Sequence, residues 1–179
     1  WDSDPDAARQ TLVRTQELTR TGLNEARRAV HALRSRPVDE LGLVLALRRL
    51  AESAAQRAGL RLMLDLPEQV TGIQPEVEQQ IYRIAEEALN NVVRHAQAQR
   101  LYLRLRRDRH TLHLTITDDG IGFDAALGSP DGHFGLTGMQ ERALLIDGDL
   151  IIQSLPDRGT QVRLCIERQP MLPDGTQKA

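Results

Sequence analysis

Apolar and polar residues alternate with two different periods along this chain, and the two periods predict different elements. Strands are predicted near residues 60–66, 100–107, 111–118, 149–155 and 160–167, and apolar and polar residues alternate through 111–118 and 160–167. Apolar residues three or four positions apart predict helices at residues 6–34, 40–58, 75–97 and 135–147. This order of elements predicts an α/β fold, a two-layer sandwich. One mixed, largely antiparallel sheet would carry helices on one face, with a further helix at the N-terminus.

Turn and capping residues suggest where the chain divides. Residues Ser35-Arg36-Pro37-Val38 break the helical pattern, and Asp39 could cap the helix that follows. The apolar residues of helix 6–34 have the spacing of a helix–helix seam, at Leu23, Ala26, Val30 and Leu33. We therefore expect an appended helical segment at residues 1–36, one domain at 38–168, and a disordered tail at 169–179.

The helix predicted at 75–97 has a polar stripe beside its apolar face. Projection at about 100° per residue gives one apolar sector, formed by Val77, Ile81, Ile84, Ala85, Ala88, Leu89 and Val92. Opposite it, and expected to face water, are Gln79, Glu86 and Asn90. The stripe at the edge of the sector is formed by Glu87, Asn91, Arg94 and His95.

The residue types in this stripe suit a metal–phosphate site. The amide oxygen of Asn91 is a hard ligand of the kind that Mg²⁺ takes, and Glu87 could hold a metal-bound water or accept a proton. Arg94 can bind phosphate oxygens with two N–H groups, and His95 can donate to phosphate or ribose. Taken alone, however, such a stripe is more often the ordinary polar margin of an amphipathic helix.

The strand at 111–118 ends in an aspartate that should point into the core. Asp118 has the same parity as Leu112, Leu114 and Ile116, whereas Asp119 should face solvent. A buried carboxylate needs a hydrogen-bond partner, and an adenine amino group is a suitable donor. Gly120 and Gly122 follow and would let the backbone approach a flat ring. An Asp-Gly hairpin turn is the alternative, but it does not explain the second glycine.

Two further glycine-containing stretches complete the set. Gly135 and Gly138 flank a helix start, where free N–H groups attract anions. Residues 124–134 have the composition of a mobile loop, which beside a pocket often acts as a lid. Gly159-Thr160 opens the last strand, and by itself reads as a hairpin turn.

Together, residues 87–95, 118–122, 135–139 and 159–160 resemble the N, G1, G2 and G3 boxes of a known ATPase domain. That domain is shared by histidine kinases, gyrase-type ATPases, Hsp90 and MutL. More narrowly, the chain resembles sensor histidine kinases paired with NarL/LuxR-type response regulators, through Glu-Ala-Leu-Asn-Asn-Val-Val-Arg-His-Ala (87–96) and Gly-Leu-Thr-Gly-Met-Gln-Glu-Arg-Ala (135–143). The resemblance covers about residues 38–168 and implies a Bergerat-type ATP-binding fold with ATP and Mg²⁺ as cofactors.

The resemblance also implies roles for individual residues. Asn91 would bind Mg²⁺, with Glu87 as its polar partner and as a possible base. Arg94 and His95 would contact phosphates, and Asp118 would bind the adenine amino group. The nucleotide pocket would further be shaped by Gly120, Gly122, Gly135, Leu136, Gly138 and Thr160.

The implied function is that of the catalytic region of a sensor histidine kinase. It would transfer the γ-phosphate of ATP to a histidine, for onward transfer to a response regulator, and the full-length protein would be a homodimer. In the resembling subfamily the acceptor histidine precedes Asp or Glu. No histidine here does so, among His31, His95, His110, His113 and His133. The acceptor is therefore expected outside this chain, and residues 1–36 resemble the second helix of a truncated dimerisation hairpin.

Two other functions stay open at this stage. A nucleotide-binding regulatory module without kinase activity would need the same pocket. An anti-sigma serine kinase uses a related ATPase domain, but it would not need the helix at 6–34.

Composition narrows the class of protein further. The 179 residues suit one domain with an appended helix, and a start at Trp1 suggests an excised N-terminus. A net charge of −2 provides no basic face for nucleic acid. The single cysteine, Cys165, excludes an internal disulfide and fits a reducing compartment. No apolar run is long enough to span a bilayer, so we expect a cytoplasmic domain, joined to a membrane only through missing sensor segments.

Overall fold

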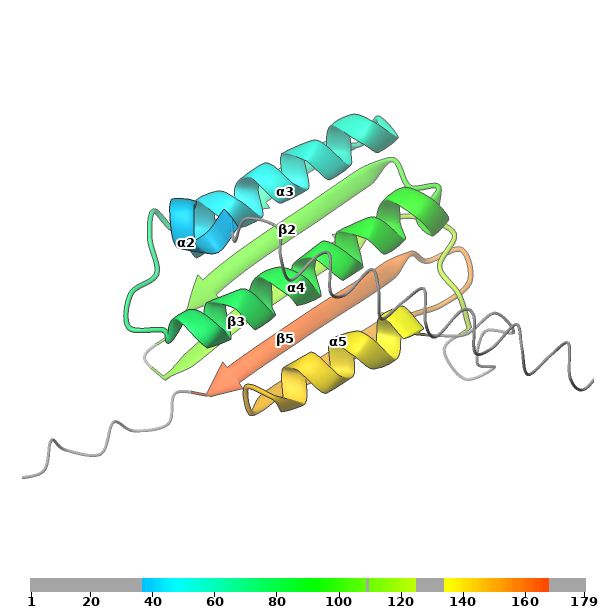
Figure 1. Ribbon diagram of the computed structural model, residues 1–179. Coiled ribbons are helices and arrows are strands. Elements are labelled where there is room, and N and C mark those ends of the chain that lie inside the picture. The colour runs from blue at the N-terminus through cyan, green and yellow to red at the C-terminus, as the bar shows by residue number, and fades with distance from the viewer. Residues whose placement is uncertain (1–36, 109, 125–133, 168–179) are drawn as a thin grey trace, which may run out of the picture. The chain divides into compact units, whose positions relative to one another are not determined.

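The computed structural model describes residues 37–108, 110–124 and 134–167, all within the compact unit Pro37–Ala179. One five-stranded sheet has the order β1-β2-β3-β5-β4 (Figure 1). Its strands are β1 (Arg61–Asp65), β2 (Arg100–Arg107), β3 (Thr111–Asp118), β4 (Gly148–Ser154) and β5 (Thr160–Glu167). β1 pairs with β2 in parallel, and every other pair is antiparallel. The predicted mixed, largely antiparallel sheet is confirmed.

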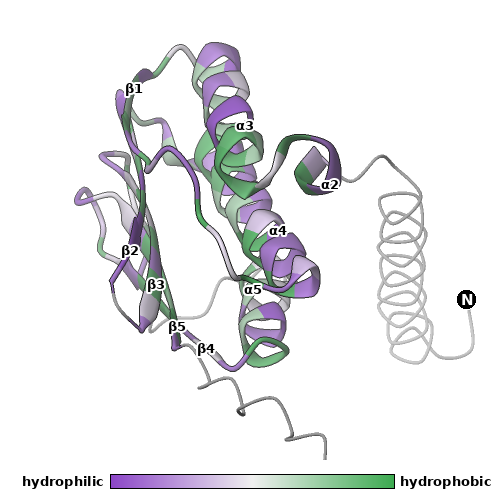
Figure 2. Cartoon of the chain, turned by 90° about the vertical axis from the view of Figure 1, so that its left-hand side faces the viewer, coloured by the Kyte–Doolittle hydropathy of each residue, from purple (hydrophilic) through white to green (hydrophobic). Residues whose placement is uncertain are grey.

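The described helices form the second layer, on one face of the sheet, as Figure 2 shows edge-on. They are α2 (Pro37–Leu41), α3 (Leu43–Ala58), α4 (Pro75–Asn91), the π-helical turn η1 (Val92–Ala96) and α5 (Phe134–Leu144). None of the helices within these described residues is long and apolar enough to cross a lipid bilayer.

The hydrophobic core lies between the two layers. The inward positions of β2 and β3 alternate as the sequence predicts, and their buried apolar residues are Leu101, Leu103, Leu105, Leu112, Leu114 and Ile116. The predicted apolar sector of α4 is also correct, since Ile81, Ile84, Ala85, Ala88 and Leu89 are buried. Burial of these apolar side chains supplies the main stabilisation of the packed layers.

Gly42 divides the helix that the sequence predicts at 40–58. Its φ of +74° lies in the left-handed region, which an α-helix cannot contain, so α2 ends before it and α3 begins after it. Asp39 therefore does not cap this helix, because it lies inside α2. Gly42 itself is the N-cap of α3, and no side chain bonds to that cap.

The helix predicted at 75–97 changes its geometry near its end. Regular α-helix stops at Asn91, η1 continues as one π-helical turn, and Gln97 ends it with a φ of +50°. A π-turn contains an extra residue, so a projection at 100° per residue does not hold beyond Asn91. The last predicted helix is also shorter, because α5 ends at Leu144 and a turn follows.

Three expectations fall on parts of the chain that the structure does not describe. The helix at 6–34 and the tail at 169–179 lie outside the described residues. So does the predicted lid at 124–134, apart from its two end residues.

Candidate functional site

The four stretches singled out in the sequence meet at one end of the sheet. Asp118, the last residue of β3, pairs with Thr160, the first residue of β5. The Glu87 carboxylate on α4 lies against Gly135 at the start of α5. In Figure 1 the end of α4, the start of α5 and the loops at the ends of β3 and β4 lie on the same side of the molecule.

Asp118 is a buried carboxylate at this end of the core. Its side chain is inward as predicted and the residue is 5% exposed. The backbone amide of Gly120 donates to Asp118 Oδ1 over 2.9 Å. Burial raises the pKa of Asp118, and the charge of Asp119 adds to this rise. Hydrogen bonds from the Gly120 and Thr160 backbones act in the opposite direction without cancelling it.

The backbone after Asp118 lies close to two other segments. A Cβ at Gly120 would overlap the carbonyl of Ala96 in η1, and the next amide, Ile121 N, donates to that carbonyl over 2.8 Å. Gly122 has a φ of +58°, and a Cβ there would overlap the carbonyl of Leu155. Glycine is therefore required at both positions by the close approach of other backbone atoms.

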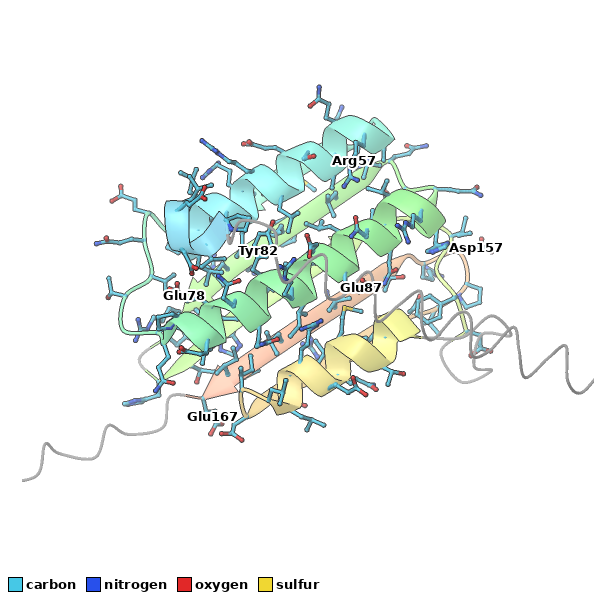
Figure 3. All side chains as sticks on the ribbon, viewed as in Figure 1. Arg57, Glu78, Tyr82, Glu87, Asp157 and Glu167 are labelled. Atoms are coloured by element: carbon cyan, nitrogen blue, oxygen red, sulfur yellow. The ribbon has the colours of Figure 1, made fainter. Side chains whose placement is uncertain are left out.

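Glu87 connects the end of α4 with the start of α5. Figure 3 labels it on the side of α4 that is next to α5. A Cβ at Gly135 would lie against Glu87 Oε1, so the glycine leaves room for the carboxylate. Gly138, one turn later, has open space around a Cβ position. Leu136 is half-buried and packs against the core.

The other residues of the polar stripe differ in exposure. Arg94 and His95 lie in η1 and are exposed. Asn91 is half-buried, and so is Asn90, which means that burial alone does not separate the two asparagines. Gln79 and Glu86 were also expected to face water but are half-buried.

Both residues have polar partners in the structure. Gln79 Nε2 donates to Asp39 Oδ1 over 2.9 Å, and Glu86 forms an ion pair of 2.7 Å with Arg83.

Ser154 is a site residue that the sequence reasoning missed. It is 8% exposed, and its Oγ accepts a hydrogen bond from Phe123 N over 2.9 Å. The same oxygen lies 2.9 Å from Thr160 Oγ1 and 3.1 Å from Gly159 O. Ser154 thus joins the loop after β3 to the β4–β5 connection. The sequence feature that could have identified Ser154 is a polar residue at an inward position of a strand, the feature that identified Asp118.

Asp119 is the second missed residue. Its side chain is 43% exposed, in line with the expectation that it faces solvent. However, Asp119 Oδ1 accepts hydrogen bonds from the backbone amides of Gln99 and Arg100, over 2.8 and 2.7 Å. Nothing in the alternation of β3 indicates these partners, since they lie in a different segment of the chain.

The oxygen donors of Glu87 and Asn91 are of the kind that suits Mg²⁺. Among the residues that the structure describes, no group of three or more His, Cys, Asp or Glu side chains could hold a metal ion. Glu87 and Asn91 lie one helical turn apart on α4. Mg²⁺ keeps several waters and uses one or two protein ligands together with phosphates, so two oxygen donors fit this ion.

The fold and this end of the sheet define a class of ATP-binding domain, and comparison with known families agrees. Residues 76–170 match the family described as histidine kinase-, DNA gyrase B-, and HSP90-like ATPase. The chain belongs to this family, as the four stretches had led us to expect.

Its relatives within the family are sensor histidine kinases. It is 37% identical over 151 residues to the sensor histidine kinase MctS of Rhizobium johnstonii, a match that covers 83% of this chain and 33% of MctS. It is 35% identical over 169 residues to the sensor histidine kinase YxjM of Bacillus subtilis, covering 92% of this chain and 39% of YxjM. The chain thus spans between one third and two fifths of the length of these relatives.

A solved structure supports the fold. The histidine kinase domain of the blue-light activated histidine kinase from Erythrobacter litoralis EL346 superposes with a TM-score of 0.57. The match covers 69% of this chain and 60% of that chain, at 21% identity. At this identity the likeness establishes the architecture.

Proposed function

We propose that this chain is the catalytic ATP-binding region of a sensor histidine kinase. It binds ATP with Mg²⁺ and transfers the γ-phosphate to a histidine in a segment outside this chain. The observation that carries the proposal is the buried Asp118 carboxylate at the end of β3. It lies beside a loop whose glycines bring the backbone close to η1 and to the β4–β5 connection.

Asp118 is the residue that selects the base. A carboxylate accepts hydrogen bonds only, so it suits the amino group at C6 of adenine and not the oxygen at C6 of guanine. Gly120 and Gly122 let the loop after Asp118 lie close to η1 and to the β4–β5 connection. Thr160, which pairs with Asp118 across the sheet and contacts Ser154, completes this side of the base site.

The phosphate end is formed by α4, η1 and the start of α5. Asn91 and Glu87 would hold Mg²⁺, and Arg94 and His95 would contact the phosphates from η1. Gly135, Leu136 and Gly138 form the first turns of α5, where free N–H groups attract anions. The chemistry that Mg²⁺ would supply here is neutralisation of phosphate charge.

Glu87 has a second role as the candidate base. Its carboxylate lies against Gly135, and the residue stands one helical turn before Asn91 on α4, where it could accept a proton. Phosphoryl transfer needs little covalent chemistry from the protein. The remaining contribution of this chain is therefore to place the γ-phosphate where an incoming histidine can reach it.

The partners belong to the same proposal and rest on the resemblance of residues 87–96 and 135–143 to sensor histidine kinases paired with NarL/LuxR-type regulators. A sensor histidine kinase passes its phosphate to a response regulator, here one of NarL/LuxR type, and the full-length protein acts as a homodimer. We place the domain in the cytoplasm, where ATP and a response regulator are both available. No nucleic acid takes part in the proposed reaction.

The alternative is a regulatory module of the same ATPase superfamily that binds nucleotide without kinase activity. Both functions use the same residues at the same end of the sheet. They differ only in whether phosphate leaves the nucleotide for a histidine, so a transfer assay separates them.

Titration calorimetry with Mg·ATP and with Mg·GTP tests the nucleotide site. We expect binding of ATP in preference to GTP, and equal affinities or no binding would contradict the base assignment. Labelled ATP would then be added together with a dimerisation hairpin from a NarL/LuxR-paired kinase. Acid-labile label on the hairpin, absent when its acceptor histidine is replaced by Gln, supports the kinase. ATP binding without any transfer favours the regulatory module.

A further inference from the structure

Asp119 connects the end of β3, through hydrogen bonds, to a segment that comes earlier in the chain. Its Oδ1 accepts hydrogen bonds from Gln99 N over 2.8 Å and from Arg100 N over 2.7 Å. Arg100 is the first residue of β2, and Gln99 lies in the short connection between η1 and β2. A single carboxylate oxygen therefore joins the strand that ends in Asp118 to the connection between η1 and β2.

A second hydrogen bond to an earlier segment is formed two residues further along the chain. Ile121 N donates to the carbonyl of Ala96 in η1 over 2.8 Å. Gly120, between Asp119 and Ile121, has no room for a Cβ because that carbonyl is in contact with it. The backbone of residues 119–121 is thus attached to η1 and to the start of β2 on both sides of Gly120.

The Asp118 carboxylate depends on this short segment. Gly120 N donates to Asp118 Oδ1 over 2.9 Å, so a displacement of Gly120 would move or release the carboxylate. Asp119 itself is held in its ionised form. Burial alone would raise the pKa of Asp119, but hydrogen bonds from the backbone amides of Arg100 and Gln99 outweigh it. The guanidinium of Arg100, 3.8 Å away, lowers the pKa further.

We propose that Asp119 is a positioning residue for base recognition. It holds the backbone before Gly120 against Gln99 and Arg100, while Ile121 holds the backbone after Gly120 against η1, and Asp119 thereby helps to set the direction in which Asp118 presents its carboxylate to the purine. Asp119 does not touch the nucleotide. The inference rests on the proposed function, because it assigns Asp119 to the same site.

The test compares two substitutions of Asp119 with one matched control. Asp119→Ala removes the acceptor, and Asp119→Asn keeps an amide oxygen that can accept from the same two amides. Asp65→Ala is the control, since Asp65 is 38% exposed and bonded to Arg104 and Arg106 at 2.8 and 3.0 Å, away from the site. All three variants lose one negative charge.

Titration calorimetry with Mg·ATP and Mg·GTP is the main measurement. In Asp119→Ala we expect ATP affinity to fall by about tenfold, as when a hydrogen bond to a charged group is lost. The ratio of ATP to GTP affinity should fall with it. Asp119→Asn should retain most of the ATP affinity and most of the ratio of ATP to GTP affinity. Asp65→Ala should match the wild type in both. A merely destabilised fold would lower the fraction of active protein without changing that ratio.

Hydrogen exchange without nucleotide separates the inference from the proposed function. Asp119→Ala should speed exchange at the amides of Gln99, Arg100 and Ile121, and Asp65→Ala should not. If wild-type protein binds neither nucleotide, the proposed function fails, while exchange still reports whether Asp119 holds the segment. If wild type prefers ATP and Asp119→Ala keeps that preference, the positioning role is refuted. Unchanged exchange at the three amides refutes it as well.

Discussion

Replacing Asp118 by asparagine would convert a hydrogen-bond acceptor at the base site into a donor. The side chain keeps its shape, and one oxygen can still accept the hydrogen bond that Gly120 N makes over 2.9 Å. The other carboxylate oxygen becomes an NH₂ group. Because the position is only 5% exposed, the new group cannot turn to bulk water without disturbing the surrounding core.

The expected loss follows from the contact that disappears. A hydrogen bond to a charged group contributes about 1.5–3 kcal/mol, and leaving the adenine amino group against another donor adds to the loss. Since about 1.4 kcal/mol corresponds to a tenfold change in Kd, ATP affinity should fall by about tenfold to a hundredfold. GTP should lose less or gain, because the oxygen at C6 of guanine can accept from the new NH₂ group.

The free energy of unfolding should change in the opposite direction from ATP affinity. Burial raises the pKa of Asp118 above the ordinary value of 3.8, so the ionised carboxylate is disfavoured in the folded protein. The protonated Asp118 carboxyl group makes its full contribution to stability below pH 3.8, and this contribution is lost as the pH rises through the raised pKa. At pH 7 the neutral asparagine avoids this cost, so the nucleotide-free variant should unfold at a temperature equal to or above that of the wild type.

Calorimetry with both nucleotides and thermal unfolding at pH 7 measure these two effects. Asp157→Asn is the control, because Asp157 is exposed on the β4–β5 connection and has a positive φ that asparagine tolerates (Figure 3). An equal loss for ATP and GTP in Asp118→Asn, or no loss, would refute the base contact. A clear drop in unfolding temperature without nucleotide would refute the account of the buried charge.

Four further expectations concern the rest of the site and the acceptor. Asn91→Ala should weaken Mg²⁺-dependent ATP binding by about 10–100-fold, and Asn90→Ala should change it little. If calorimetry finds the same effect for both variants, the assignment of Asn91 as the metal ligand is wrong. Gly138→Ala should raise helix stability by up to about 1 kcal/mol, since a Cβ there meets nothing, and yet weaken ATP binding if this turn borders the nucleotide. Ser154→Ala should lower the free energy of unfolding by about 1–3 kcal/mol because buried backbone groups lose their partner, and an unchanged denaturant midpoint would contradict this. The chain alone should not autophosphorylate with labelled ATP, and acid-labile phosphate that disappears in His31→Gln would make His31 the acceptor.

Local periodicity was enough to place most of the helices and strands and the direction of their side chains. The alternation through β3 correctly predicted that Asp118 points inward, because successive side chains of any strand point to opposite faces. The three- and four-residue spacing along α4 likewise identified the buried face that packs on the sheet. The order of the four stretches was also sufficient to indicate the ATPase family, since the family's motifs are short and contiguous.

Tertiary structure decided what depends on segments that are distant in sequence. The π-turn of η1 lies where Ala96 meets Gly120 and Ile121, and no local pattern in residues 92–96 distinguishes it from α-helix. Asp119 faces solvent by its parity, yet it binds the amides of Gln99, just before β2, and of Arg100, its first residue, because β2 and β3 are paired in one particular register. Side-chain direction is a property of the local backbone, whereas hydrogen-bond partners are set by strand register and layer packing, which arise only when the whole domain folds.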